Sequence, residues 1–383
     1  MSTAQAVTDA RVRVLRGQSA SPSATQAVAE VLAQIQQDDQ KVVLFFASTR
    51  YDLDELAAAL REGCSAQVVL GCTSAGEHGP AGPTRGGLSA VGFAGEVDID
   101  CHLIRLGQID EGVAAVAAGS AELRSRHPER SAFGLLLADG LSKQEERLAL
   151  ALYRDAPMIP IVGGSAGDDL TFEQTLVFHD GAFHRSAAVF ATFALNESIS
   201  TIKFQHFEPG EELFVITDAD PDDRIIREIN GEPASVVYAR AIGVSPEKLD
   251  SATCSHHPIV VQIGDQVYVR SIAAVNADGS LGMFCAVDVG VVFTLGVAID
   301  PVETTRRAFS QAVDEIGAPQ VVLGCTCILR RLEFEQSGRV PEICALYRKY
   351  AVSGFDTYGE QFNGVHVNQT FTGVAIGAAS KNP

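Results

Sequence analysis

The stretch KVVLFFAS at residues 41–48, with YDLDELAAALREG at 51–63 and QVVLG at 67–71, decides the fold. The first segment is apolar without a break, which is typical of a strand covered on both faces. The second has apolar residues at helical spacing, an acidic start and a terminal Gly63. The third leads directly into the loop GCTSAGE at 71–77. Two such strands joined by a crossover helix predict parallel pairing in an α/β fold.

The same pattern returns later in the chain. FGLLLADG at 133–140 precedes a helix-like KQEERLALALYR, and PIVGG then enters the loop GGSAGDD at 163–169. Leu44 and Gly71 are 27 positions apart, and so are Leu136 and Gly163. This matched spacing indicates an internal duplication. We expect core strands at 42–46, 68–70, 135–137 and 159–162.

A third, looser copy lies near the C-terminus. QVVLGCTCILRR at 320–331 begins as a buried strand, EICALYRKY at 342–350 is helix-like, and the loop GFDTYGE follows at 354–360. Equivalent loops of repeated units lie at the same sheet edge, where α/β proteins commonly bind ligands. We therefore expect the three loops to gather in one region. Whether they form the rim of a ligand pocket or only turn the chain stays open.

Between the second and third copies the pattern changes to strands. Residues 173–220 alternate apolar and polar positions, with turn signals at Asp180-Gly181 and Pro209-Gly210. Further turns are expected at Gly264-Asp265 and Asp278-Gly279. The predicted fold class is α/β, with internally duplicated strand–helix–strand units in an N-terminal domain at 25–215. A mixed α/β C-terminal domain containing antiparallel strands is predicted at 216–378.

Composition excludes several classes of protein. The chain has 48 acidic and 29 basic residues, a formal charge of −19, which argues against non-specific nucleic-acid binding. Its start lacks an apolar signal segment, and no stretch of about 18 apolar residues predicts a membrane span. The eight cysteines are scattered through a long chain and do not resemble a disulfide framework. A cytoplasmic protein is the expectation.

Motifs for catalysis are weak. The loops lack the lysine of a phosphate-binding loop and the spacing of a dinucleotide fingerprint, and no G-x-S-x-G stands in the needed register. We expect no enzyme, although Cys72 or Cys325 as a nucleophile is a remaining alternative. Cys254 with His256 and His257 offers metal ligands at one turn. A buried thiol beside loop imidazoles is the favoured interpretation of that group.

Taken in order, the motifs resemble a known family. LGCTSAGE at 70–77, VGGSAGDD at 162–169, YVRSIAAVNADGS at 268–280, and VSGFDTYGEQ with HVNQT at 352–370 resemble the tandem FIST_N and FIST_C domains. The resemblance covers residues 25–378 and implies sensory, small-ligand-binding domains of bacterial signal transduction. The positions that match the family loops, and that the resemblance implies as ligand-binding, are Gly71, Ser74, Gly76, Gly163, Gly164, Gly167, Asp168, Arg270, Tyr358, Gly359, Glu360 and Asn368.

Two further segments, 206–234 and HHPIVV at 256–261, resemble the nitric-oxide-sensing FIST proteins called NosP. That resemblance implies haem b, nitric oxide as the ligand, and control of a partner histidine kinase or a diguanylate cyclase or phosphodiesterase. His257 and His206 are the alternative ligands of the haem iron, since both lie beside apolar residues.

The competing hypothesis is a haem-free FIST sensor of amino acids or similar metabolites. Arg270 or the loop amides would then hold a carboxylate, and the histidines would be ordinary. In either case the chain carries no kinase, cyclase or helix-turn-helix signature, so a signal is expected to pass through another protein. The sequence leaves self-association into a homo-oligomer open.

Overall fold

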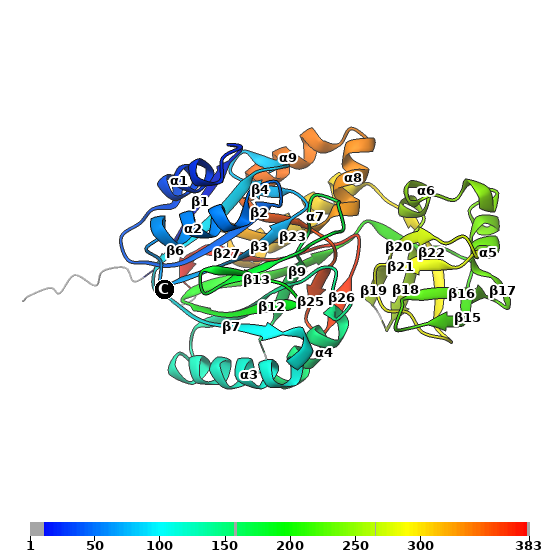
Figure 1. Cartoon of the computed structure of the whole chain (residues 1–383), viewed down its shortest axis with the longest axis horizontal. Helices are drawn as coiled ribbons and strands as arrows, with labels where there is room; N and C mark the ends of the chain where they lie inside the picture. The colour runs from blue at the N-terminus through cyan, green and yellow to red at the C-terminus, as the bar shows by residue number, and fades with distance from the viewer. Residues whose placement is uncertain (1–10, 157–158, 265, 381–383) are drawn as a thin grey trace, which may run out of the picture.

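The computed structural model describes residues 11–156, 159–264 and 266–380. The chain forms two lobes that lie side by side, and the smaller one is built from the green and yellow middle of the chain (Figure 1). The large lobe comprises residues 11–206 and 299–380, and the small lobe residues 207–298. Within the described ranges, no helix is long and apolar enough to cross a membrane.

The large lobe consists of three copies of one unit, each with a strand, a helix, a second strand, helical cover, a third strand, a short hairpin and a long closing strand. The first copy is β1 (Val12–Ser19), α1 (Ala24–Ile35), β2 (Gln40–Ser48), α2 (Leu53–Gly63), β3 (Val68–Ser74), β4 (Glu77–Gly79), β5 (Gly82–Thr84) and β6 (Leu88–Gly95). The second is β7 (Val97–Arg105), a 3-10 turn (Leu106–Gln108), α3 (Ile109–Arg126), β8 (Ser131–Ala138), α4 (Glu145–Asp155), β9 (Ile161–Ser165), β10 (Val177–His179), β11 (Ala182–His184) and β12 (Ala187–Leu195). The third is β13 (Glu197–Phe204), α7 (Pro301–Ile316), β23 (Pro319–Cys327), α8 (Ile328–Gln336), α9 (Val340–Lys349), β24 (Val352–Thr357), β25 (Glu360–Phe362), β26 (Val365–Val367) and β27 (Phe371–Ser380).

The predicted α/β class and the parallel pairs are confirmed. β2 pairs in parallel with β3, β8 with β9, and β23 with β24. The Asp180-Gly181 turn joins the antiparallel strands β10 and β11, with φ of 49° and 76° at its two residues. Both angles are positive, as a tight two-residue hairpin with the right-handed strand twist requires.

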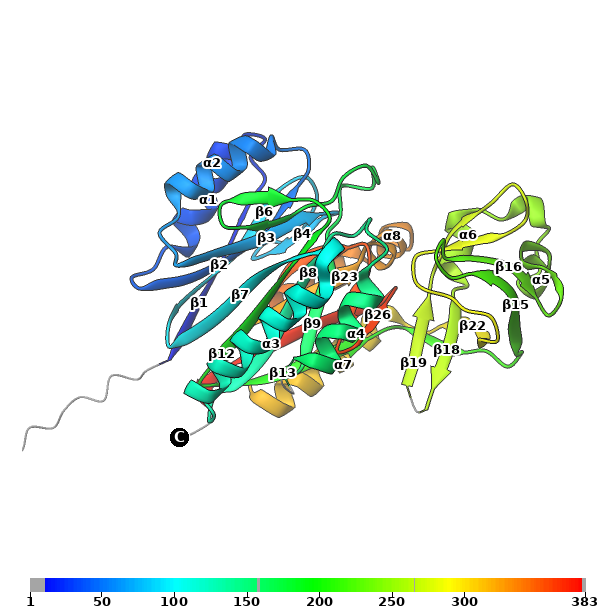
Figure 2. The same ribbon diagram turned by 60° about the horizontal axis from the view of Figure 1, so that its bottom comes forward.

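Each hairpin adds to the sheet of a different copy. The β10–β11 hairpin of the second copy extends β3 of the first, β25–β26 of the third extends β9 of the second, and β4–β5 of the first extends β24 of the third. The exchange is cyclic, so the three sheets close into one body (Figure 2). The third copy, from the C-terminal part of the chain, is therefore part of the same lobe as the first two.

The continuous apolarity of these strands has a simple cause. Along β2, Val42, Leu44 and Phe46 face a central core shared by all three copies. Val43 and Phe45 face the opposite way, into a layer formed with α1 and α2. Both faces are covered, so polar alternation would bury unpaired polar groups.

The small lobe is inserted between β13 and α7. It contains a 3-10 turn (Pro246–Lys248) and β14 (Phe207–Pro209), β15 (Phe214–Asp220), β16 (Ile225–Ile229), β17 (Glu232–Pro233), α5 (Ala234–Ala241), α6 (Ser251–His256), β18 (Ile259–Ile263), β19 (Gln266–Arg270), β20 (Ile272–Val275), β21 (Leu281–Met283) and β22 (Val292–Ala298). Its strand pairs are antiparallel, as the sequence predicts, and Asp278-Gly279 turns between β20 and β21. The turn expected at Gly264-Asp265 includes Asp265, which lies outside the described residues.

The chain passes between the lobes twice, beside His206 and Ile299, whose backbones share a 2.8 Å hydrogen bond. The lobes do not follow the division at residues 215 and 216, because residues 299–378 pack in the large lobe. β13 ends at Phe204 opposite Phe371, where β27 begins, so the insertion leaves from the edge that also carries the three loops.

Candidate functional site

The three glycine loops meet at the carboxyl ends of the parallel strands. The amide of Ala75 donates to the carbonyl of Asp356 (3.0 Å), that of Gly167 to Thr73 (3.1 Å), and that of Tyr358 to Ser165 (3.1 Å). Each contact joins two different copies. The loops therefore gather in one region, as the repeated topology leads us to expect.

The glycines in these loops serve close packing. A Cβ on Gly71 would lie 2.3 Å from the carbonyl oxygen of Phe45, and one on Gly163 would lie 2.2 Å from that of Leu136. A Cβ on Gly164 would meet Thr357, one on Gly167 would meet Ala75, and one on Gly76 would meet Asp356. The loops thus fill the space between them, and these glycines are not among the lining residues of the five described cavities.

Two carboxyl groups, those of Glu77 and Glu360, are buried beneath the three glycine loops. Ser74 donates to Glu77 (2.6 Å), and the amide of Gly87 donates to its other oxygen (2.9 Å). Thr357 and Thr370 hold Glu360 in the same way. Burial raises the pKa of both Glu77 and Glu360 to about 8. Ser74 and Glu360, which the family resemblance implies as ligand-binding, are fully covered.

The loop of the second copy departs from the other two. β4 begins at Glu77 and β25 at Glu360, but the second copy continues through residues 170–176 before its hairpin. Asp168 organises this extension, because its carboxylate accepts hydrogen bonds from the amides of residues 172–174 and from the hydroxyl of Tyr358. The extension carries Phe172, 47% exposed, onto the ring of Tyr358.

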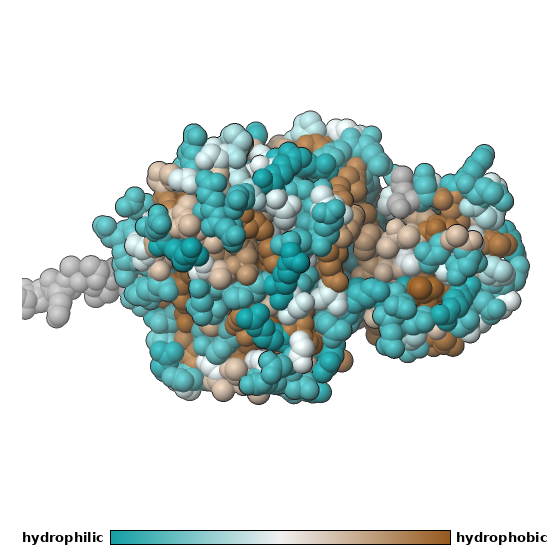
Figure 3. Space-filling model, viewed as in Figure 1, coloured by the Kyte–Doolittle hydropathy of each residue, from teal (hydrophilic) through white to brown (hydrophobic). Residues whose placement is uncertain are grey.

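The small lobe closes over this edge through polar contacts. Arg224 pairs with Glu145 (2.7 Å) and Glu146 (2.6 Å) of α4, and Glu146 also accepts from the amide of Ala286 (2.6 Å). Arg270 donates to the carbonyl of His366 (3.2 Å). A constriction separates the lobes, with hydrophobic surface beside it (Figure 3). A polar interface of this kind is typical of domains that move relative to one another.

Within this seam, two buried polar atoms stand without a hydrogen-bond partner among the described residues: Nε2 of His366 and Nδ2 of Asn368. Both side chains are 1% exposed. A Cβ on Gly359 would lie 2.6 Å from the first atom and 3.2 Å from the second, so both face the same space. Buried polar atoms nearly always have a hydrogen-bond partner, so two neighbouring atoms without one need an explanation. We call Arg270, Tyr358, Gly359, His366 and Asn368 the junction site.

The junction site is closed in this conformation. The cavity beside Tyr358 and Asn368 has a volume of about 10 Å³, enough for one water molecule. Burial lowers the pKa of the His366 imidazole, which keeps the ring neutral. Of the residues that the family resemblance implies, the structure brings Arg270, Tyr358, Gly359 and Asn368 together here. His366 was not among them, although it is the first residue of the HVNQT motif.

Of the two predicted haem ligands, His206 has no ring nitrogen available to an iron, and His257 has an exposed ring that lines no described cavity. His206 is fully buried, its Nε2 donates to Glu333 (2.8 Å), and its Nδ1 accepts from Arg330 (2.8 Å), so neither ring nitrogen is open. His257 is exposed at the end of α6 and lines none of the described cavities. A haem needs an apolar pocket around its macrocycle, and neither histidine is among the lining residues of the five described cavities.

Neither Cys72 nor Cys325, the two candidate nucleophiles, has the environment of an activated thiol. Burial raises the pKa of both Cys72 and Cys325, so both are protonated thiols inside the core. Cys254 is buried while His256 and His257 are exposed. Among the described residues, no group of three or more His, Cys, Asp or Glu side chains is arranged to hold a metal ion.

Comparison with known protein families and solved structures shows which family the chain belongs to. A model of the FIST N domain matches residues 41–232, and a model of the FIST C domain matches residues 234–363. No curated protein matches the chain. Among solved structures, one described as "Cyanuric acid hydrolase: evolutionary innovation by structural concatenation" is similar at 8% identity with a TM-score of 0.35, over 96% of this chain and 99% of that chain. A likeness that weak carries no argument about activity. The two family models together span most of the sequence, and the chain therefore belongs to the FIST family, whose domains are small-ligand sensors in signal transduction.

Proposed function

We propose that this protein senses a small carboxylate-bearing metabolite, of the amino-acid class, which binds between its lobes at the junction site. The observation that carries the proposal is the pair of unpartnered buried atoms, His366 Nε2 and Asn368 Nδ2, that face one space beside Arg270. On this proposal the chain is a sensor and not an enzyme.

The junction site offers donors, which suits an anionic ligand. The amide nitrogen of Gln361 donates to Nδ1 of His366 (3.0 Å), so the neutral ring carries its proton on Nε2. Asn368 adds amide N–H groups and Arg270 adds a permanent positive charge. Charge-assisted hydrogen bonds to a carboxylate are about twice as strong as neutral ones.

Ligand entry requires the lobes to part, because the closed cavity admits only water. The two chain passages beside His206 and Ile299 are the natural hinge between the lobes. The closed cavity has no room for such a ligand, so binding between the lobes shifts the population away from the closed form. We propose that a partner histidine kinase, diguanylate cyclase or phosphodiesterase reads this shift.

A calorimetric titration of the protein with a panel of L-amino acids tests the proposal. We expect at least one to bind, and its carboxamide analogue to bind about tenfold more weakly, because one charge-assisted contact is lost. Arg270→Met should weaken binding similarly. Arg227→Met is the matched control, since Arg227 pairs with Asp220 inside the small lobe. Equal affinity for acids and carboxamides would contradict the site.

Haem-based sensing of nitric oxide is the second proposal, supported by the resemblance of residues 206–234 and 256–261 to NosP. His257 is its candidate ligand, because its ring is exposed while its carbonyl is anchored by Tyr238 (2.8 Å). Protein purified after growth with added haem should then show a strong visible absorption band that His257→Ala loses. A colourless protein would end this proposal and leave the metabolite proposal intact.

A further inference from the structure

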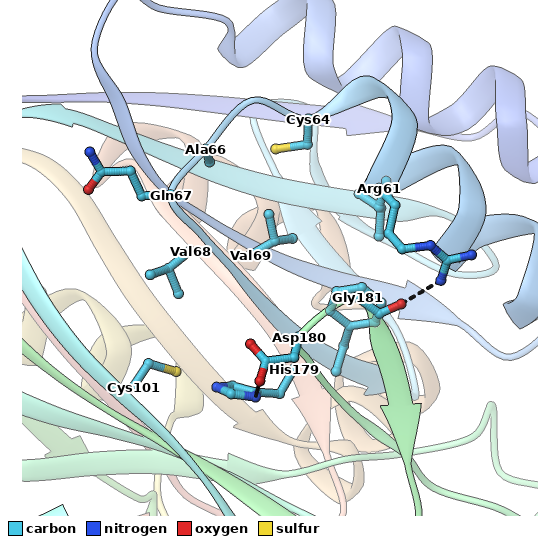
Figure 4. A pocket seen from close by; sticks show the side chains of 12 residues that line it. Arg61, Cys64, Ala66, Gln67, Val68, Val69, Cys101, His179, Asp180 and Gly181 are labelled. Atoms are coloured by element: carbon cyan, nitrogen blue, oxygen red, sulfur yellow. Dashed lines mark hydrogen bonds and ion pairs between the residues drawn. The ribbon is translucent and has the colours of Figure 1, made fainter.

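A second cavity lies in the large lobe, in the first copy and away from the junction site. It has a volume of about 410 Å³, near the lower end of the range for small-molecule sites. Its walls come from the end of α2, the start of β3, the β10–β11 hairpin and β7 (Figure 4). None of its lining residues belongs to the junction site.

The cavity lies beneath a contact between a helix and a hairpin tip, and each of the three copies has an equivalent contact. The ninth residue of α2, Arg61, donates to the carbonyl of Gly181 at a hairpin tip (2.6 Å). The ninth residue of α9, Arg348, donates to Ala81 at the corresponding tip (2.6 Å). In the second copy, Tyr153 of α4 packs against Gly364. In each copy, the ninth residue of the helix thus contacts the hairpin of another copy.

Only in the first copy does the strand beneath this contact remain accessible. Val69 lies two residues before Gly71 and is half-buried. Ile161 and Val352, two residues before Gly163 and Gly354, are 1% and 0% exposed. The second and third copies therefore fill the position that the first copy leaves open. Because the strands and hairpins are otherwise alike, the cavity is a local departure from the repeated packing.

The cavity has both apolar and polar walls, and one fixed positive charge lies at its mouth. Its half-buried apolar lining residues include Ala66, Val68 and Val69, while Leu60 and Phe178 are almost fully buried behind them. Burial raises the pKa of the two wall thiols, Cys64 and Cys101, so both stay protonated and behave as small hydrophobes. At the rim, Arg61 uses one guanidinium nitrogen on Gly181. The guanidinium is always charged and has five donor N–H groups, so it can hold a carboxylate as well.

The rim also carries the exposed carboxylate of Asp180. His179 lies 3.2 Å from Asp180, and the pair is drawn at the lower edge of the opening in Figure 4. Figure 4 shows Arg61 reaching to Gly181, on the same hairpin as His179 and Asp180.

We propose that this cavity is a second ligand site, which binds a small molecule with an apolar chain and one carboxylate, such as a medium-chain fatty acid. The chain lies on Val68 and Val69, and the carboxylate pairs with Arg61. Burial of the methylene groups supplies most of the affinity, and the charge pair fixes the orientation.

Ligand-observed NMR titration with sodium octanoate, on the full chain, tests the proposal. We expect saturable binding that Val69→Phe abolishes by filling the cavity. Arg61→Met should weaken octanoate by about tenfold, and 1-octanol should bind wild type about as weakly.

The matched control is Arg348→Met, which removes the equivalent hairpin contact in the third copy, where Val352 is fully buried. Thermal unfolding of both arginine variants separates a loss of fold from a loss of binding, and we expect similar unfolding shifts but a binding loss only in Arg61→Met. Absence of saturable binding by wild type, or equal affinity in the two arginine variants, would overturn the proposal. Neither result bears on the junction site.

Discussion

At the scale of single residues, the acids that end the first and third glycine loops are structural. Glu77 and Glu360 both have an exposed fraction of 0% and accept hydrogen bonds from their own loops. Each also accepts a backbone amide just before the closing strand, at Gly87 and Thr370. They connect the start of the hairpin to the start of the long strand, which explains an acid at that position without any ligand.

These two carboxyls predict a pH dependence of stability. Burial raises their folded-state pKa to about 8, from 4.5 as the ordinary value, so the folded protein holds more protons than the unfolded one between these limits. Stability is then greatest below about pH 4.5 as far as these groups are concerned, and falls as pH rises toward 8, by up to about 5 kcal/mol per group. Urea unfolding at pH 5.5 and 8.5 should show the fall.

Glu77→Gln or Glu360→Gln should flatten that dependence, because the amide cannot ionise. Glu342→Gln is the control, since Glu342 is 47% exposed beside Arg339. A double variant at Glu77 and Glu360 that keeps the full wild-type slope would show that other groups cause it.

At the scale of elements, the parallel strands approach so closely that a side chain cannot stand between them. A Cβ on Gly163 of β9 would lie 2.2 Å from the carbonyl oxygen of Leu136 in β8. A Cβ on Gly71 would clash in the same way with the carbonyl oxygen of Phe45, and a Cβ on Gly354 with that of Gly324. The matched glycines of the three copies are therefore explained by strand packing.

Gly163→Ala is accordingly expected to destabilise the protein by about 2–4 kcal/mol, because backbone must shift to admit the methyl group. Gly107→Ala is the control, since nothing lies within 4 Å of a Cβ at that position. Urea unfolding should place Gly107→Ala within about 0.5 kcal/mol of wild type. Equal stability of the two variants would contradict this account of the glycines.

At the scale of the whole molecule, the ion pairs between α4 and the small lobe hold the closed form. Arg224 is 8% exposed, and its two partners Glu145 and Glu146 lie on the large lobe. Removing one partner of such a buried pair leaves an unbalanced charge, which the open form relieves by exposing it to water.

Arg224→Met should therefore shift the lobes toward an open arrangement. Small-angle X-ray scattering should report a larger radius of gyration, and hydrogen exchange should rise around β20 and Asn368. Arg227→Met, which affects a pair inside the small lobe, should leave both unchanged. An unchanged radius in Arg224→Met would show that these ion pairs do not control closure.

The sequence by itself determined the strands, the helices and the repeat, because these depend on local pattern. Unbroken apolar runs require cover on both faces, and a 27-residue spacing places equivalent glycines at equivalent strand ends. These features predicted the parallel pairs and the meeting of the loops. The family resemblance supplied Arg270, Tyr358, Gly359 and Asn368 as site positions.

Only the tertiary structure decided how the copies combine. Hairpin exchange between copies, such as β4 with β24, joins residues more than 270 positions apart, and no local pattern encodes such a pairing. The insertion of the small lobe likewise brings Arg270 to His366 across 96 positions. Packing also decided how the glycine loops meet: they fill one another, because the close approach of neighbouring backbone leaves no room for side chains at their glycines.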